Sequence, residues 1–283
     1  MPQRLERVPE PSAVMDSEDN VQDFDAIMGT NISISLCGMI DLIGRLEFDR
    51  ARGVAVDLAC GPGHFTLMLA EQFEFERVIG IDLSPGMIRQ AEANAQAAGL
   101  ADRVSFMHGD ATSASELIDS EVDLVTCTNS AHHLPTHDLL ARMVADMDRM
   151  VGDQGLAIVM DLTRLKTAWA VERYVKVMGQ EYLDAGLEYL FDDFRNSMFA
   201  AWTEPEMQQA CPRSEQRAWF HFALKPLPIN QFLVSFPKGS TPKLGSFDWV
   251  SGVPMEDRYR SDFARFQAAK EQAFKRMKAC PGG

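Results

Sequence analysis

Three aspartates stand where short apolar runs end, and their positions suit the binding of a single ligand. Asp57, Asp82 and Asp110 each lie in or directly after such a run. Runs of this kind are typical of parallel strands, whose carboxyl ends meet at the sheet edge where ligands bind. Asp82 also follows Gly61 by about 20 residues, the spacing at which a carboxylate binds the ribose of a nucleotide. The three aspartates therefore predict a nucleotide-type ligand.

A glycine-containing loop, D-L-A-C-G-P-G over residues 57–63, follows the first run. Gly61 and Gly63 permit positive φ angles and close backbone approach, and the helix expected after them offers free N–H groups. Thr66 stands where a dinucleotide fingerprint has its third glycine, and no G-K-[ST] of a P-loop follows. Carboxylates without adjacent basic residues favour a cationic ligand that lacks phosphate. S-adenosylmethionine, with its ammonium, sulfonium and ribose diol, fits that description.

The elements that must position these residues alternate between strand and helix. Strands are expected at residues 54–58, 78–82, 104–108, 122–127, 156–161, 219–224 and 231–236. Strand–helix–strand repetition with short connections requires right-handed crossovers and a parallel sheet. The predicted fold class is α/β, a Rossmann-like, doubly wound, seven-stranded and mainly parallel sheet.

Helical segments are expected before, within and after this core. Apolar spacing predicts two helical pieces before the first strand, with a break around residues 29–31, and Thr203 with Glu206 predicts a capping box. The expected organisation is a flexible N-terminus at 1–20, a helical lid segment at 21–48, a core at 49–237 with a helical insertion at about 164–202, and a C-terminal helical extension at 238–283.

Four ordered motifs resemble those of class I S-adenosylmethionine-dependent methyltransferases of the small-molecule type. They are V-D-L-A-C-G-P-G, V-I-G-I-D-L-S-P-G-M, F-M-H-G-D-A and D-L-V-T-C-T-N-S-A-H-H-L. The resemblance is close over residues 50–165 and looser out to about 237. One departure is Ala59, which stands where the family usually has its first glycine.

The resemblance implies a cofactor site made of residues from all four motifs. Asp57 and the backbone of Gly61 and Gly63 would hold the methionine end of S-adenosylmethionine, with Ala59 in the same loop. Asp82 would bind the ribose, and Leu83 would lie against the adenine. Asp110 would accept a hydrogen bond from the adenine amino group, with Ala111 beside it, and Thr128 and Asn129 would border the methionine amine.

Catalysis of methyl transfer depends mainly on positioning and on exclusion of water. A general base is needed only if the acceptor arrives protonated, and His133 and His132 are the candidates. Either histidine could instead only cap or pack its loop. Asp161 is a second candidate, with a solvated or Arg164-paired aspartate as the alternative. The aromatic residues of the insertion could line an apolar pocket or merely pack the insertion onto the sheet.

The amino-acid composition limits which binding partners and which cellular compartment are expected. The chain has 283 residues, 46% of them hydrophobic, and a formal charge of −14, which disfavours nucleic acid and anionic membranes as partners. Its five cysteines form no C-x-x-C pair, so neither a disulfide framework nor a metal site is predicted. We expect a cytoplasmic enzyme with a small-molecule substrate, and a homodimer through the C-terminal helix is possible. The alternatives are a non-catalytic S-adenosylmethionine-binding module and an NAD-dependent oxidoreductase.

Overall fold

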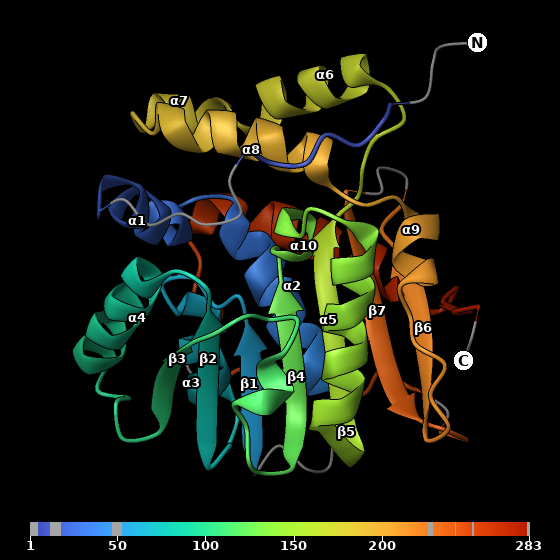
Figure 1. The fold of residues 1–283 in the computed structure, drawn as a ribbon. Coiled ribbons are helices and arrows are strands. Elements are labelled where there is room, and N and C mark those ends of the chain that lie inside the picture. Colours follow the sequence, from blue (N-terminus) through green and yellow to red (C-terminus); the bar gives the residue numbers. More distant parts are fainter. Residues whose placement is uncertain are drawn as a thin grey trace.

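The strands form one mixed sheet of order β3-β2-β1-β4-β5-β7-β6-β8 (Figure 1). The computed structural model describes residues 5–11, 18–46, 53–225, 229–240, 242–250 and 252–281. The strands within them are β1 Val54–Leu58, β2 Arg77–Asp82, β3 Val104–His108, β4 Val122–Thr128, β5 Val151–Leu162, β6 Arg217–Ala223, β7 Asn230–Pro237 and β8 Lys278–Ala279.

The first five strands are parallel, as predicted, and β7 runs antiparallel between β5 and β6. The predicted count of seven strands is wrong, because eight occur among the described residues. The additional strand, β8, pairs antiparallel with the outer edge of β6. Its two residues are exposed and carry no hydrophobic alternation, so periodicity does not predict this strand.

The helices connect the strands in the expected alternation. Their bounds are α1 Glu18–Asp25, α2 Ile32–Arg45, α3 His64–Gln72, α4 Pro85–Ala98, α5 His137–Met150, α6 Ala168–Met178, α7 Gln180–Asp184, α8 Glu188–Ala200, α9 Glu204–Gln209 and α10 Arg260–Phe274. Short 3₁₀ turns lie at η1 Ala26–Gly29, η2 Ala114–Glu116, η3 Ala131–His133 and η4 Asp257–Tyr259. The predicted capping box of Thr203 and Glu206 opens α9.

Two apolar layers cover the sheet. One layer contains buried residues of α2, α3 and α10, such as Ile40, Phe65 and Phe274, packed against one face. The other contains residues of α5 and α9, such as Leu140 and Met207, packed against the opposite face. Both faces of the parallel strands are therefore covered, which leaves their carboxyl edge as the place for a ligand. Among the described residues, no helix is long and apolar enough to cross a membrane.

A helical cover lies over the carboxyl edge of the sheet (Figure 1). It combines α1 and η1 with the insertion helices α6, α7 and α8, and Ile27 packs with Tyr182 and Leu190 at their junction. The predicted break between two N-terminal helical pieces is confirmed, because α2 begins after Thr30 and Asn31. The helical insertion is confirmed as well.

Residues 5–11, which we name the N-terminal strap, lie along this cover. Two long-range hydrogen bonds connect the strap to the helical insertion, since the Leu5 N–H donates to the Lys166 carbonyl at 3.0 Å and the Val8 N–H donates to the Phe199 carbonyl at 3.2 Å. Composition does not reveal these contacts, and the flexibility expected for residues 1–20 stays a prediction. Residues 1–4 and 12–17 lie outside the described residues, and the other domain boundaries stay predictions.

Candidate active site

The loop after β1 has a strained backbone that brings it close to the ligand edge. Ala59, Gly61 and Gly63 have φ angles of 52°, 53° and 84°. A left-handed conformation costs an L-residue about 1–2 kcal/mol, which explains why glycine suits the position of Ala59 in the family that this loop resembles. A Cβ atom on Gly63 would lie 2.8 Å from Cζ of Phe106, so packing also requires glycine there.

Asp82, at the end of β2, is held by the backbone of two loops. The Gly61 N–H donates to its Oδ2 atom and the Ser84 N–H donates to its Oδ1 atom, both at 2.8 Å. Each carboxylate oxygen can accept a second hydrogen bond. Burial raises the pKa of Asp82, although the two backbone hydrogen bonds oppose that effect. The carboxylate is thus oriented before any ligand binds.

A cavity of about 320 Å³ opens beside this carboxylate. Of the residues predicted from sequence, the cavity wall contains Ala59, Gly61, Asp82, Leu83, Asp110, Ala111 and His133. The wall does not contain Asp57, Gly63, Thr128, Asn129 or His132. The ends of β1, β2 and β3 therefore meet at one cavity, as parallel pairing requires.

Asp57 lies beneath the glycine loop and is 2% exposed. The hydroxyl groups of Thr66 and Thr126 donate to its two oxygens at 2.8 and 2.9 Å. Burial raises its pKa to about 7, against the opposing effect of these two hydrogen bonds. In this structure the contacts of Asp57 join β1, α3 and β4 under the loop, and its predicted contact with a ligand stays a prediction.

The end of β4 carries buried oxygen atoms that have no partner. Asn129 has a φ angle of 53°, and its amide nitrogen donates to the Ser35 hydroxyl at 3.1 Å. Among the described residues, Thr128 Oγ1 and Asn129 Oδ1 are buried without a hydrogen bond. Buried acceptors without a partner are costly, so a ligand ammonium group would suit this position.

The two histidines after β4 have different surroundings. His132 is buried, and its Nδ1 atom lies 2.6 Å from Oδ1 of Asp161. Burial lowers the pKa of His132, but the charge and hydrogen bond of Asp161 outweigh that effect and raise it to about 9. His133 is on the cavity wall, and its Nδ1 atom forms an ion pair with Oε2 of Glu10.

Glu10, which is not among the residues predicted from sequence, reaches this pair of histidines from the N-terminal strap. Its side chain is 3% exposed and accepts a hydrogen bond from the Ser197 hydroxyl at 2.7 Å. Burial raises the pKa of Glu10, but the hydrogen bond with His133 and the charges of both histidines outweigh it, so the pKa falls to about 2. No motif or spacing relates residue 10 to residues 132 and 133, so the sequence held no signal for this contact.

Two further expectations are corrected. Asp161 is neither solvated nor paired with Arg164, because it is fully buried against His132 while Arg164 binds Glu206 at 2.9 Å. The aromatic residues of the insertion do not line the cavity, and those in the apolar clusters pack within the cover. The apolar part of the cavity wall includes instead Phe24 of α1 and Leu139 and Met143 of α5.

Comparison with known proteins gives one domain match and several partial relatives. Residues 55–155 match a methyltransferase domain family. Trans-aconitate 2-methyltransferase of Escherichia coli is 31% identical over 153 residues, which cover 53% of this chain and 55% of that protein. Demethylmenaquinone methyltransferase of Bacteroides fragilis is 28% identical over 108 residues, 38% of this chain and 42% of that protein. Each match thus covers less than two thirds of the relative.

Solved structures share the fold at low sequence identity. The plantazolicin methyltransferase BamL, solved in complex with a triazolic desmethylPZN analogue and SAH, has a TM-score of 0.57 and 15% identity, covering 77% of this chain and 91% of that chain. A putative S-adenosylmethionine-dependent methyltransferase of Methanococcus maripaludis has a TM-score of 0.51 and 17% identity, covering 85% and 98%. Residues 55–155 are therefore identified as a methyltransferase domain, and the chain shares the α/β fold of these solved structures.

Proposed function

We propose that this protein transfers the methyl group of S-adenosylmethionine to a small-molecule acceptor. The observation that carries the proposal is the carboxylate of Asp82, oriented by the Gly61 and Ser84 amides on the wall of a cavity. Two oriented acceptor atoms at the end of the second strand match the hydroxyl pair of a ribose. The trans-aconitate and demethylmenaquinone methyltransferases among the relatives are named for small acceptors, which supports the same class of substrate.

Part of the predicted set lines the cavity, which supports S-adenosylmethionine as the cofactor, whereas Asp57, Gly63, Thr128 and Asn129 lie outside the cavity wall. Asp82 would bind the ribose hydroxyls, and the half-exposed Leu83 would lie against the adenine, with Asp110 and Ala111 at its amino group. Ala59 and Gly61 would lie along the methionine end, above the buried Asp57 and with Gly63 shaping the turn. The unpartnered oxygens of Thr128 and Asn129 would accept from the methionine ammonium. When bound, this cofactor supplies an electrophilic methyl group on a sulfonium.

On the acceptor side, we propose His133 as the catalytic residue and His132 as a positioning residue. His133 is on the cavity wall, whereas His132 is buried behind it and held by Asp161. A small acceptor beside His133 would lie under the cover of α1 and α8, which limits access of water. In-line methyl transfer gains most from such positioning and water exclusion.

Calorimetry with S-adenosylhomocysteine tests the cofactor part of the proposal. Asp82→Asn replaces one charged acceptor, and we expect about a 10- to 100-fold weaker affinity, since a hydrogen bond to a charged group contributes about 1.5–3 kcal/mol. Asp102→Asn, at an exposed position away from the cavity wall, is the control and should bind as the parent does. Equal affinity of the parent and Asp82→Asn would refute the assignment, and tight binding of NAD in its place would favour an oxidoreductase.

Transfer of a labelled methyl group tests the reaction itself. Incubated with labelled S-adenosylmethionine and fractionated cell extract, the protein should label the small-molecule fraction. The net charge of −14 opposes a polyanionic acceptor such as nucleic acid. Label in RNA or protein would contradict the small-molecule assignment, and cofactor binding without any transfer would indicate a non-catalytic binding module.

A further inference from the structure

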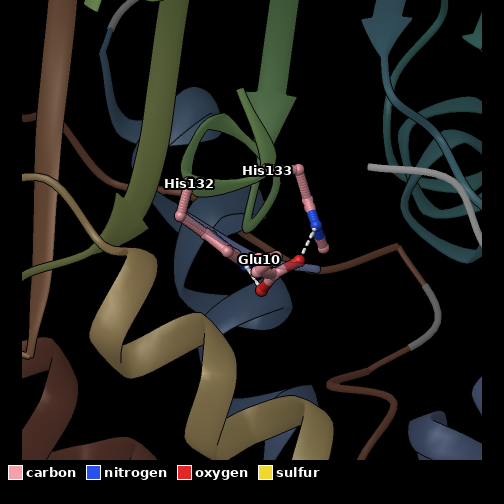
Figure 2. A group of neighbouring side chains, drawn as sticks. All are labelled: Glu10, His132 and His133. Atoms are coloured by element: carbon pink, nitrogen blue, oxygen red, sulfur yellow. Dashed lines mark ion pairs between the residues drawn. The ribbon is translucent and has the colours of Figure 1, made fainter. Parts of the chain in front are cut away.

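Glu10, His132 and His133 bring three potential metal ligands together beside the cavity (Figure 2). Their ligand atoms all lie within 4.8 Å of one another. Oε1 of Glu10 lies 3.7 Å from Nε2 of His132, while its Oε2 atom pairs with Nδ1 of His133. The carboxylate points toward both rings, so a cation between the three groups requires only small side-chain shifts.

The side chains around this cluster hold its members by hydrogen bonds, as the outer partners of metal ligands do. A metal-binding histidine usually donates its other ring N–H to a carboxylate, which fixes the ring and its tautomer. His132 has this arrangement, because its Nδ1 atom contacts Asp161 at 2.6 Å and leaves Nε2 directed to Glu10. The Ser197 hydroxyl holds Oε1 of Glu10 at 2.7 Å. Asp161 thus orients His132, and Ser197 orients Glu10.

Burial and charge also favour a cation here. The side chains of Glu10 and His132 are 3% and 4% exposed, and that of His133 is 23% exposed. Asp161 is fully buried, with its Oδ2 atom lacking a hydrogen-bond partner among the described residues. Two arginines lie close by: Arg164 is engaged by Glu206, and Arg7 donates to the His132 carbonyl at 2.8 Å and interacts electrostatically with Glu10 and Asp161. Buried carboxylates in such surroundings are stabilised by a positive charge.

We propose that Glu10, His132 and His133 bind a first-row divalent transition-metal cation such as Zn²⁺ or Fe²⁺. Imidazole ligands suit these cations, whereas Mg²⁺ and Ca²⁺ prefer oxygen ligands alone. Two histidines and one carboxylate leave coordination positions free. Because Glu10 belongs to the N-terminal strap, the cation also fastens the strap to the loop after β4.

The free positions give the site a role toward the methyl acceptor, and this part rests on the proposed function. His133 is on the cavity wall, so an oxygen or nitrogen atom of the acceptor can reach the cation from the cavity. A bound cation would lower the pKa of a coordinated acceptor hydroxyl, as it lowers the pKa of coordinated water. The acceptor proton would then pass to a water molecule, the acceptor oxygen would bond to the methyl carbon as its bond to sulfur breaks, and S-adenosylhomocysteine would leave. His133 would act as a ligand of the cation rather than as a general base.

Titration of the chelator-treated protein with Co²⁺ tests the site through visible absorption, independently of activity. The parent should develop a ligand-field band with imidazole coordination and should retain about one Zn²⁺ per chain after incubation and desalting, measured by elemental analysis. His132→Ala and His133→Ala should abolish the band. Glu10→Gln should weaken Co²⁺ affinity by at least about 100-fold, and Asp161→Asn by about 10- to 100-fold.

Glu6→Gln is the matched control, since Glu6 is an exposed carboxylate on the same strap. It should bind Co²⁺ as the parent does. Circular dichroism and S-adenosylhomocysteine calorimetry on each variant separate loss of the metal site from misfolding and from failure of the cofactor assignment. A parent that binds Co²⁺ no more tightly than Glu10→Gln would overturn the proposal, and the cluster would then be a hydrogen-bonded relay to His133.

Discussion

At the scale of single residues, the ligand edge concentrates unusual backbone conformations. Ala59 and Asn129 are the non-glycine residues with positive φ among the described residues, and both lie at the carboxyl ends of neighbouring strands, β1 and β4. Strained positions of this kind persist only where the surrounding structure enforces them, and they cluster at functional sites. The residues with positive φ therefore lie at the same edge of the sheet as the cavity and the carboxylates.

Gly63→Ala should destabilise the protein more than Gly99→Ala does. Both glycines have positive φ, 84° and 70°, so both variants bear the cost of a left-handed alanine. Only at Gly63 would the new Cβ atom meet Phe106 and Ala91, at 2.8 and 3.0 Å, while nothing lies within 4 Å at Gly99. We expect the difference in free energy of unfolding to be about 1–3 kcal/mol, the cost of overpacking. Equal losses in urea unfolding would contradict the packing at Gly63.

We expect Asp57 to lower the free energy of unfolding as the pH rises from 4 to 7. Burial raises its pKa from 3.8 to about 7 in the folded state, so the folded protein binds more protons than the unfolded chain in this range. The stabilisation by the protonated carboxyl is therefore lost as pH rises, by up to about 1.4 kcal/mol per pH unit. Asp57→Asn should remove this contribution. In urea unfolding, the free energy of unfolding of the variant should therefore rise relative to that of the parent as the pH increases toward 7. Parallel stability curves would argue against a protonated Asp57.

At the scale of elements, α2 and α10 are joined by a close approach and a buried ion pair. A Cβ atom on Gly38 would lie 2.2 Å from Phe266, so glycine permits the helices to meet. Lys270 has no exposed surface, and its ammonium donates to Asp41 at 2.7 Å and to the Gly38 carbonyl at 2.8 Å. This contact links the C-terminal helix to the N-terminal segment behind the sheet.

Lys270→Met should cost about 3–5 kcal/mol of unfolding free energy, because it leaves Asp41 buried without this partner. The double variant Lys270→Met/Asp41→Leu should recover most of the loss, since an apolar pair of similar size removes the uncompensated charge. Chemical unfolding of the parent, both single variants and the double variant forms a complete cycle. If the double variant is as unstable as the sum of the single variants, the two side chains are not coupled.

At the scale of the whole molecule, segments far apart in sequence together cover the carboxyl edge of the sheet (Figure 1). The N-terminal strap hydrogen-bonds to Lys166 and Phe199, and Phe24 of α1 contributes to the cavity wall. Arg7 of the strap donates to the carbonyls of Ala200 and His132 at 2.6 and 2.8 Å. The helical cover and the carboxyl edge of the sheet are thus in direct contact, and both contribute to the cavity wall.

Binding of S-adenosylhomocysteine should therefore slow hydrogen exchange in both the sheet edge and the cover. We expect protection at residues 59–63, 82–84 and 109–112, which border the cavity, and at residues 18–31, because Phe24 lies on its wall. Helix α10 contributes no residue to the wall and serves as the internal reference. Protection confined to the sheet loops would show that α1 does not respond to the ligand.

The sequence alone determined that the motifs follow successive parallel strands, and it predicted part of the cavity wall, namely Ala59, Gly61, Asp82, Leu83, Asp110, Ala111 and His133. Gly61, Asp82 and Asp110 act through local chain geometry, since each follows a buried parallel strand and such strands end at one edge. Only the tertiary structure decided that Glu10 meets His133, that Asp161 holds His132 and that β8 joins the sheet. Periodicity reports which face of an element is buried, whereas the partner of a polar side chain more than a hundred residues away depends on how all the elements pack together.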